Sequence, residues 1–378
     1  MTPWLVRAWY PLMRREMLRV AKIAKVDVQG QEHVRKALAS GAGVLITPNH
    51  SFHYDSYVLG HAAQQIGRPF HFLTAWQVFA MSTPFQRWVM QKHGCFSIDR
   101  ESADLGAFKR SVEILRTHSC PLAIFPEGDI YHTNERVMPF REGAAAIALS
   151  AAKRADRPIV AIPAAIRCRY LDDPLPGLLD LMNRLEAAIH WRPRPDLPLT
   201  DRIYRFAEGL LALKELEYLG RPQSGTVVER TRLLANQILQ EKEQRFGIKP
   251  QSDSTPERVK ELRRQFIQQL ERPDLDATAH AQLKRDMEDL FLVIQLYSYP
   301  GDYVAESPSI ERIAETLDKF EEDVLKVAYP KSHGRRQASV QFGEPILVPA
   351  ERGQRDAVAE LTTRLEQSVQ SLLNQKAV

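Results

Sequence analysis

A histidine and a carboxylate stand five residues apart at the end of a buried-strand pattern, and this pair offers acid–base chemistry. His50 and Asp55 follow the apolar run 44–46, where a strand should give way to a helix over residues 55–66. Histidine can take a proton near neutral pH, and a nearby carboxylate can hold its tautomer and stabilise its charged form. In open α/β sheets, sites are built at the C-terminal ends of strands. We therefore expect His50 to act as a general base that Asp55 orients.

Three further blocks with the pattern of short buried strands follow this pair. They are residues 94–100, 121–128 and 158–166. The first delivers Arg100 at its end, and the second ends in Phe-Pro-Glu-Gly with Glu127 and Gly128. With His50 and Asp55 in an Asn-His-Ser context, these ordered blocks resemble the glycerolipid acyltransferase family, typified by bacterial 1-acylglycerol-3-phosphate acyltransferases. The resemblance covers about residues 20–171 and 336–350.

The resemblance implies transfer of a fatty acyl group from acyl-CoA or acyl carrier protein to the hydroxyl of a lysophospholipid or glycerol-phosphate-type acceptor. It assigns His50 and Asp55 the roles stated above. It also implies that Arg100 binds the acceptor phosphate and that Glu127 and Gly128 shape the acceptor site. The acyl donor is a co-substrate, so neither a cofactor nor a metal is expected.

Residues 139–143 resemble a later Phe-Lys-x-Gly element of the same family, which makes Arg141 a second cation for the acceptor. The third block departs from the family, which often continues Thr-Arg-Ser after the glycine. Here Asp129, Ile130 and Tyr131 follow Gly128, so one cation is missing and a carboxylate is near. This departure puts a phosphate-bearing acceptor in question and leaves the acyl-transfer chemistry intact.

Two other functions compete with acyl transfer. His50, His53 and Asp55 could ligate a metal in a hydrolase, with Glu127 or His132 completing the set, although the spacing matches no known metal motif. Alternatively, a lipid-binding scaffold could keep the α/β shell and act through its helical segment. The chain has no Gly-x-Ser-x-Gly elbow, which argues against a serine hydrolase of the α/β type.

The pattern of strands and helices predicts an α/β fold with a mostly parallel central sheet flanked by helices and interrupted by a large all-helical insert. Helices over 103–117 and 143–155 suit crossovers between parallel strands. We expect residues 1–172 and 336–378 to form the acyltransferase domain and residues 173–335 to form the insert. No internal repeat is apparent, and the sequence suggests no partner for the insert.

Composition and charge suit a globular protein that works at a membrane surface. Among 378 residues, 44% are hydrophobic, 26% are charged, and the net charge is +4. No apolar run approaches the roughly 18–20 residues of a spanning helix. Three cysteines without a close pair indicate reduced thiols in the cytoplasm. We expect a peripheral protein on the inner face of the membrane, with no nucleic-acid partner.

Two stretches are rich in aromatic residues. Residues 3–23 mix aromatic side chains with arginines, which suits an interfacial anchor or, equally, a helix that covers the sheet. Residues 76–90 hold tryptophan, phenylalanine and methionine, which suit an acyl-chain groove or, for most of them, ordinary core packing.

Overall fold

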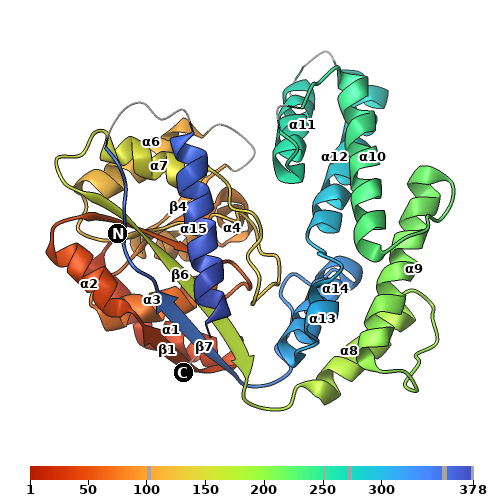
Figure 1. The fold of residues 1–378 in the computed structure, drawn as a ribbon, viewed down its shortest axis with the longest axis horizontal. Coiled ribbons are helices and arrows are strands. Elements are labelled where there is room, and N and C mark those ends of the chain that lie inside the picture. Colours follow the sequence, from red (N-terminus) through yellow and green to blue (C-terminus); the bar gives the residue numbers. More distant parts are fainter. Residues whose placement is uncertain (100–103, 251, 271, 273–274, 351–355, 376–378) are drawn as a thin grey trace. The chain divides into compact units, whose positions relative to one another are not determined.

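The chain folds into two compact units, each built around its own core. The computed structural model describes residues 1–99, 104–250, 252–270, 272, 275–350 and 356–375. The first unit combines Met1–Pro176 with Tyr329–Val378, and the second is Gly177–Ala328. The first unit contains the sheet and the second contains helices, as the element labels of Figure 1 show.

The first unit is organised by one mostly parallel sheet, which confirms the predicted fold class. Its strands are β1 (Ile23–Gln29), β2 (Gly43–Pro48), β3 (His71–Ala75), β4 (Cys95–Ile98), β5 (Leu122–Ala123), β6 (Ile159–Tyr170), β7 (Arg336–Phe342) and β8 (Ile346–Leu347). The strand order is β1-β7-β6-β2-β5-β3-β4, and β8 pairs with β6. Only the pairs that β6 makes with β7 and β8 are antiparallel. Strands β6, β2, β5, β3 and β4 therefore end at one edge.

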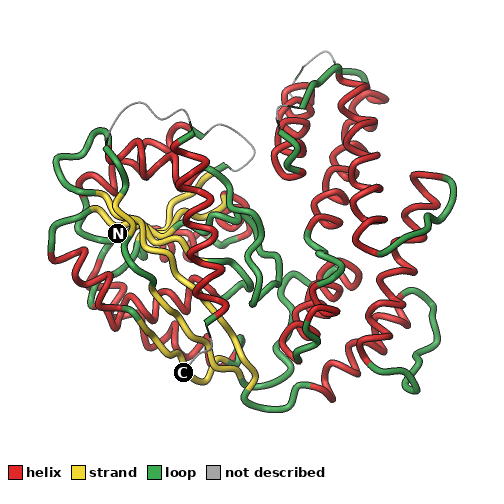
Figure 2. Tube along the Cα trace, in the orientation of Figure 1, coloured by secondary structure: helices red, strands yellow, loops and turns green. Residues whose placement is uncertain are grey.

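Helices cover both faces of this sheet (Figure 2). One face carries α1 (Pro3–Arg19), α2 (Gln31–Ala39) and α3 (Asp55–Ile66), and the other carries α6 (Leu105–Thr117), α7 (Gly143–Ala152) and α15 (Ala357–Asn374). Strand β2 shows why both faces need cover, since all six of its residues are buried. Val44 and Ile46 enter the core beneath α3, whereas Leu45 enters the core beneath α7. Such a strand reads as a continuous apolar run because it has no solvent face.

The aromatic stretch after β3 forms two short helices, α4 (Trp76–Met81) and α5 (Pro84–Lys92). Every residue of both helices is described, and none of them is buried. The expectation that most of these aromatic and methionine side chains fill a core is therefore wrong. Helical periodicity identifies a helix but does not show what covers its apolar face.

The second unit contains helices and, in its described residues, no strand. Its elements are α8 (Leu175–Ala188), α9 (Leu199–Leu219), α10 (Val227–Phe246), α11 (Thr255–Leu270), α12 (Ala277–Tyr297), α13 (Tyr303–Glu306) and α14 (Ile310–Leu325). Helices α10, α11 and α12 share an apolar core that includes Leu234, Phe266 and Leu290.

A repeated ion pair joins consecutive helices of this second unit. The pairs are Glu186 with Arg202 at 2.7 Å, Glu215 with Arg230 at 2.7 Å, and Glu243 with Arg258 at 2.8 Å. In each pair the glutamate lies near the end of one helix, and the arginine lies in the first turn of the next. The three arginines recur every 28 residues, each directly after an acidic residue. This spacing of 28 residues is carried by charged side chains and not by an apolar pattern.

The chain leaves the sheet and returns to it at neighbouring positions. Tyr170 at the end of β6 is paired with Arg336 at the start of β7. Just beyond, the Leu171 amide donates to the Arg335 carbonyl at 2.8 Å, and the Arg335 guanidinium grips the Asp172 carboxylate with two hydrogen bonds. The sheet thus holds both ends of the intervening segment together. Within the described parts of the chain, no helix is both long enough and apolar enough to cross a bilayer.

This arrangement predicts that the first unit folds without the second. Replacing residues 177–328 by a flexible Gly/Ser linker of roughly ten residues should leave a soluble protein with a single cooperative unfolding transition. Circular dichroism and thermal unfolding measure this. As a matched control, replacing residues 177–342 also removes β7, which lies between β1 and β6, and should prevent folding. Aggregation of the first variant would show that the second unit completes the sheet domain.

Candidate active site

His50 and Asp55 lie on either side of the turn that joins β2 to α3. Strand β2 ends at Pro48, and α3 begins with Asp55 itself. Asp55 is therefore in the first turn of a helix, where free backbone N–H groups and the helix dipole favour a negative charge. The turn places the imidazole and the carboxylate at the C-terminal edge of the parallel strands.

Asp55 is a buried carboxylate whose Oδ2 atom accepts three hydrogen bonds. The donors are His50 Nδ1 at 2.8 Å, the Ser51 amide at 2.7 Å and the Phe52 amide at 3.1 Å. Asp55 has no exposed surface. Because an ionised carboxylate only accepts, the Nδ1 atom of His50 must carry the hydrogen. Neutral His50 then presents an unprotonated Nε2, which is the form a general base requires.

Besides its hydrogen bond to Asp55, the imidazole of His50 packs against an aromatic ring, and it remains partly exposed to solvent. Its ring stacks on Phe125, with centroids 4.1 Å apart and an angle of 26° between the planes. Its side chain is 19% exposed. Nε2 makes no hydrogen bond to any residue that the structure describes, so this atom is available to a substrate.

Glu127 supports the backbone of His50. Its Oε1 accepts from the His50 amide at 2.6 Å, and its Oε2 accepts from the Met138 amide at 3.0 Å. The side chain is 2% exposed. Burial raises the pKa of Glu127 to about 8, although the two amide hydrogen bonds oppose this shift. In this arrangement Glu127 positions His50, since both oxygens already accept backbone hydrogen bonds away from solvent.

Gly128 and Arg141 meet beside this carboxylate. Gly128 has φ +78°, a left-handed conformation that glycine adopts without strain. A Cβ atom at this position would come within 2.5 Å of Arg141 Nε, so the guanidinium lies directly over the glycine. The Arg141 amide donates to the Pro126 carbonyl at 2.8 Å. Arg141 is thus a cation at the same strand end as Glu127. It also lies beside buried Tyr131, where burial raises the tyrosine pKa to about 12 and Arg141 opposes the shift.

The loop between Gly128 and Arg141 is anchored by the last helix of the chain. In α15, Glu366 accepts from the Phe140 amide at 2.7 Å. Gln370 accepts from the Val137 amide at 3.0 Å and donates to the Glu135 carbonyl at 3.2 Å. The later segment of the first unit, through α15, therefore fixes the loop of the earlier segment that ends at Arg141. Contacts between residues more than 200 positions apart leave no local pattern, so the sequence did not indicate these two residues.

Two asparagines extend the sheet beyond the ends of its strands. Asn49 donates to the Ile166 carbonyl at 3.0 Å and accepts from the Ile166 amide at 2.7 Å. Asn134 makes the same pair of bonds with Cys168, at 2.8 and 2.7 Å. Each side-chain amide pairs with the backbone of β6 as a neighbouring strand would. Because Asn49 directly precedes His50, its two hydrogen bonds also hold the backbone next to His50 in place. The position of Asn49 next to His50 was the sequence signal for such a role, because a buried side-chain amide needs hydrogen-bond partners.

Arg100, the predicted phosphate-binding residue, lies outside the described residues. The other predicted site residues, His50, Asp55, Glu127, Gly128 and Arg141, are brought together. His53 instead lies against the rings of His132 and Tyr329, with centroids 5.9 and 4.9 Å away. Among the described residues, neither His50 nor Asp55 belongs to a group of three or more side chains that converge closely enough to ligate a metal. This geometry does not favour the metal-dependent hydrolase.

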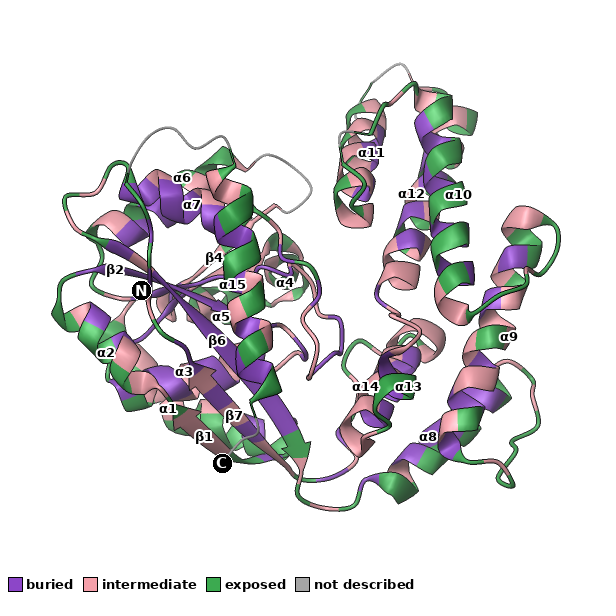
Figure 3. Ribbon diagram, viewed as in Figure 1, coloured by how far each residue is buried: buried purple, intermediate pink, exposed green. Residues whose placement is uncertain are grey.

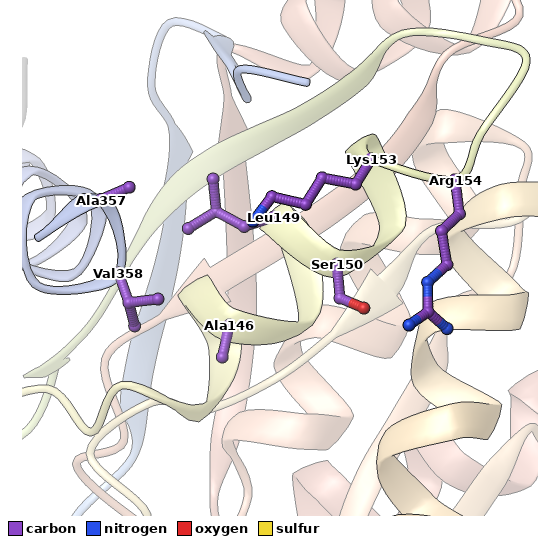
Figure 4. A pocket seen from close by; sticks show the side chains of 7 residues that line it. All are labelled: Ala146, Leu149, Ser150, Lys153, Arg154, Ala357 and Val358. Atoms are coloured by element: carbon purple, nitrogen blue, oxygen red, sulfur yellow. The ribbon is translucent and has the colours of Figure 1, made fainter. Parts of the chain in front are cut away.

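A surface hollow of about 330 Å³ lies away from this site. It is formed by α7 and the start of α15, and Leu149, Ser150, Lys153 and Val358 contribute to its lining (Figure 4). None of the predicted site residues lines it. The hollow is therefore separate from the His50–Asp55 pair.

The raised pKa of Glu127 predicts a pH-dependent contribution to stability. The folded protein holds the proton more tightly, so the contribution is fully present below the unfolded pKa near 4.5 and is lost as the pH rises through about 8. The free energy of unfolding of the wild type should therefore fall, relative to Glu127→Gln, between these two pH values. Denaturant titrations at several pH values measure this difference.

The readout is the slope with pH, because replacing an oxygen by an amide costs stability at every pH. Glu142→Gln, at an exposed position of the same segment, is the matched control and should follow the wild type. Equal slopes for the wild type and Glu127→Gln would show that Glu127 is ionised throughout this range.

Comparison with known proteins gives one family match. Residues 25–167 match the family model described as Acyltransferase. The match runs from β1 to the middle of β6 and includes His50, Asp55, Glu127, Gly128 and Arg141. No curated protein matches the chain. Residues 25–167, a part of the first unit, therefore belong to the acyltransferase family.

Proposed function

We propose that this protein transfers a fatty acyl group from the thioester of acyl-CoA or acyl carrier protein to a lipid hydroxyl. The observation that carries the proposal is the His50–Asp55 pair, with Nδ1 bound to the buried carboxylate and Nε2 open at a partly exposed strand end. Acyl transfer to an alcohol needs a base at this position. The acyltransferase-family domain supports this class of reaction.

In the proposed reaction, His50 Nε2 accepts the proton of the acceptor hydroxyl as its oxygen attacks the thioester carbonyl carbon. A carbon–oxygen bond forms, and the carbonyl oxygen takes up negative charge in a tetrahedral intermediate. Its collapse breaks the carbon–sulfur bond, and the departing thiolate receives the proton from the imidazolium. Asp55 stabilises that imidazolium, and no acyl-enzyme is needed.

The acceptor is proposed to be a lysophospholipid or glycerol-phosphate-type lipid at the cytoplasmic face of a membrane. Arg141 supplies one cation over Gly128, and Arg100 is assigned to the same role by its place in the sequence. Neither an added metal nor a cofactor is part of this mechanism.

The mechanism predicts that His50→Ala reduces turnover by a factor on the order of 10²–10⁴, because it removes the general base. Asp55→Asn should also lose most activity, since it removes the charge that stabilises the imidazolium. Release of free thiol from an acyl thioester, with lipid product measured by mass spectrometry, gives both rates. His53→Ala, in the same turn, is the matched control and should stay near the wild type. Near-wild-type turnover of purified, folded His50→Ala would disprove the mechanism.

The acceptor site predicts that lysophosphatidate is not the best acceptor. A phosphate monoester needs several cationic or backbone donors, whereas Ile130 stands where the resembled family often carries an arginine, and the carboxylate of Asp129 precedes it. A charged contact contributes about 1.5–3 kcal/mol, so one lost donor costs roughly tenfold or more in binding. A lysophospholipid whose phosphate is masked by a head group should react faster.

A competition assay with one acyl donor and several acceptors measures the ratio of second-order rate constants. Arg141→Ala should bring the second-order rate constants of the phosphate-carrying acceptors closer together. A clear preference of the wild type for lysophosphatidate, lost in Arg100→Ala, would show instead that the site holds a complete phosphate clamp.

A further inference from the structure

The helices α4 and α5 expose an unusually apolar surface for their size. Trp76 and Trp88 are each 45% exposed, Phe85 is 60% exposed, and Met81 is 73% exposed. Figure 3 shows the contrast with α7, whose ribbon is largely coloured as buried. Large exposed apolar patches on soluble proteins mark sites of protein or membrane interaction.

The two helices hold this surface in a defined conformation. Thr83 and Gln86 form a capping box at the start of α5, in which each side chain accepts from the other residue's amide. The Arg87 guanidinium donates to the carbonyls of Phe79, Ala80 and Ser82 at 2.7, 3.1 and 3.0 Å. Arg87 thus ties the end of α4 to α5. The outward direction of the apolar side chains is therefore built into the fold.

The same surface continues onto α1. The ring of Trp9 lies 6.0 Å from that of Phe85, and the Thr2 amide donates to the Lys92 carbonyl at 2.8 Å. Trp4, in the first turn of α1, is 69% exposed. The aromatic residues of α1 and α5 therefore belong to one patch, which we call the aromatic face: α4, α5 and the first half of α1.

The charges around the aromatic face are almost all positive. Helices α4 and α5 contain Arg87 and Lys92 and no acidic residue. The Lys92 ammonium lies 5.9 Å from the centre of the Trp88 ring. In the first half of α1 the charged residue is Arg7, and the second half, outside the aromatic face, adds three arginines and the acidic residue Glu16. Tryptophan and cationic residues together are typical of surfaces that lie at the boundary between lipid head groups and acyl chains, and such surfaces prefer anionic lipids.

The sheet connects the aromatic face to the candidate active site. Strand β5 pairs in parallel with both β2 and β3, so β2 and β3 end at the same edge. His50 follows the end of β2, and Trp76 follows the end of β3 directly. A bilayer seated on α4 would therefore meet the edge of the sheet that carries His50.

We propose that the aromatic face is the surface by which this protein docks on an anionic lipid bilayer, with α4 inserting beside the strand ends that carry His50. The bilayer delivers the lipid acceptor, so this inference extends the proposed function. The docking itself does not depend on turnover and can be measured without it.

The test compares binding to vesicles of neutral phosphatidylcholine with binding to vesicles that also contain anionic phosphatidylglycerol. The wild type should float with the anionic vesicles and bind less at high salt, because salt screens the charges. The variant Met81→Glu/Phe85→Glu/Trp88→Glu should bind at least about tenfold more weakly. It leaves intact the capping box and the Arg87 hydrogen bonds, and circular dichroism checks its fold. The matched control, Leu213→Glu/Leu216→Glu, changes two exposed leucines of α9 and should float like the wild type.

Three results would overturn docking through the aromatic face. They are failure of the wild type to float, equal flotation of the triple variant, and an equal loss of binding in the α9 control. His50→Ala should float like the wild type, which separates binding from chemistry. A protein that floats through this face but transfers no acyl group would refute the proposed function and leave the docking inference standing.

Discussion

A carboxylate that is removed from water needs hydrogen-bond donors, and the Oδ2 atom of Asp55 finds them in the turn before it, whereas its buried Oδ1 atom has no partner among the described residues. Three donors converge on one oxygen because β2 ends and α3 begins within a single short turn. One of these donors is His50 itself, so the bond that stabilises the buried charge also sets the imidazole tautomer. The hydrogen bond between His50 and Asp55 therefore contributes both to the stability of the fold and to the proposed chemistry.

Glu127 shows the same constraint with a different result. It has two amide donors on separate oxygens and lies near the negative charge of Asp55. Burial and that neighbouring charge favour its protonated form. Two buried carboxyl groups in one site thus differ in their surroundings, with three donors on one oxygen of Asp55 and one donor on each oxygen of Glu127. Glu127 binds the backbone amide of His50, and Asp55 binds its imidazole ring.

The sequence predicted the features that arise from local pattern. Helices expected over 55–66 and 103–117 are found as α3 and α6, because apolar spacing and the surrounding strands are local signals. The placement of His50 and Asp55 followed from the position of β2. By contrast, the anchoring of the Gly128–Arg141 loop by Glu366 and Gln370 is a contact across the whole chain. The family resemblance assigned Glu127 to the acceptor site, whereas only the fold shows which backbone amides donate to its oxygens. The exposure of α4 and α5 likewise depends on what packs nearby.

The position of β7 has a consequence for how the protein is made. Strand β1 has β7 as its parallel neighbour, and β7 in turn connects it to β6 and the rest of the sheet. Roughly 300 residues separate β1 from β7, and a ribosome that adds about 5–20 residues per second needs roughly 15–60 s to make them. During that interval β2 to β6 can assemble, while β1 waits with its edge unpaired. An unpaired strand edge is a template for association with other chains. The nascent protein thus passes through a stage in which its first strand needs shielding, and the last part of the chain to emerge ends that stage.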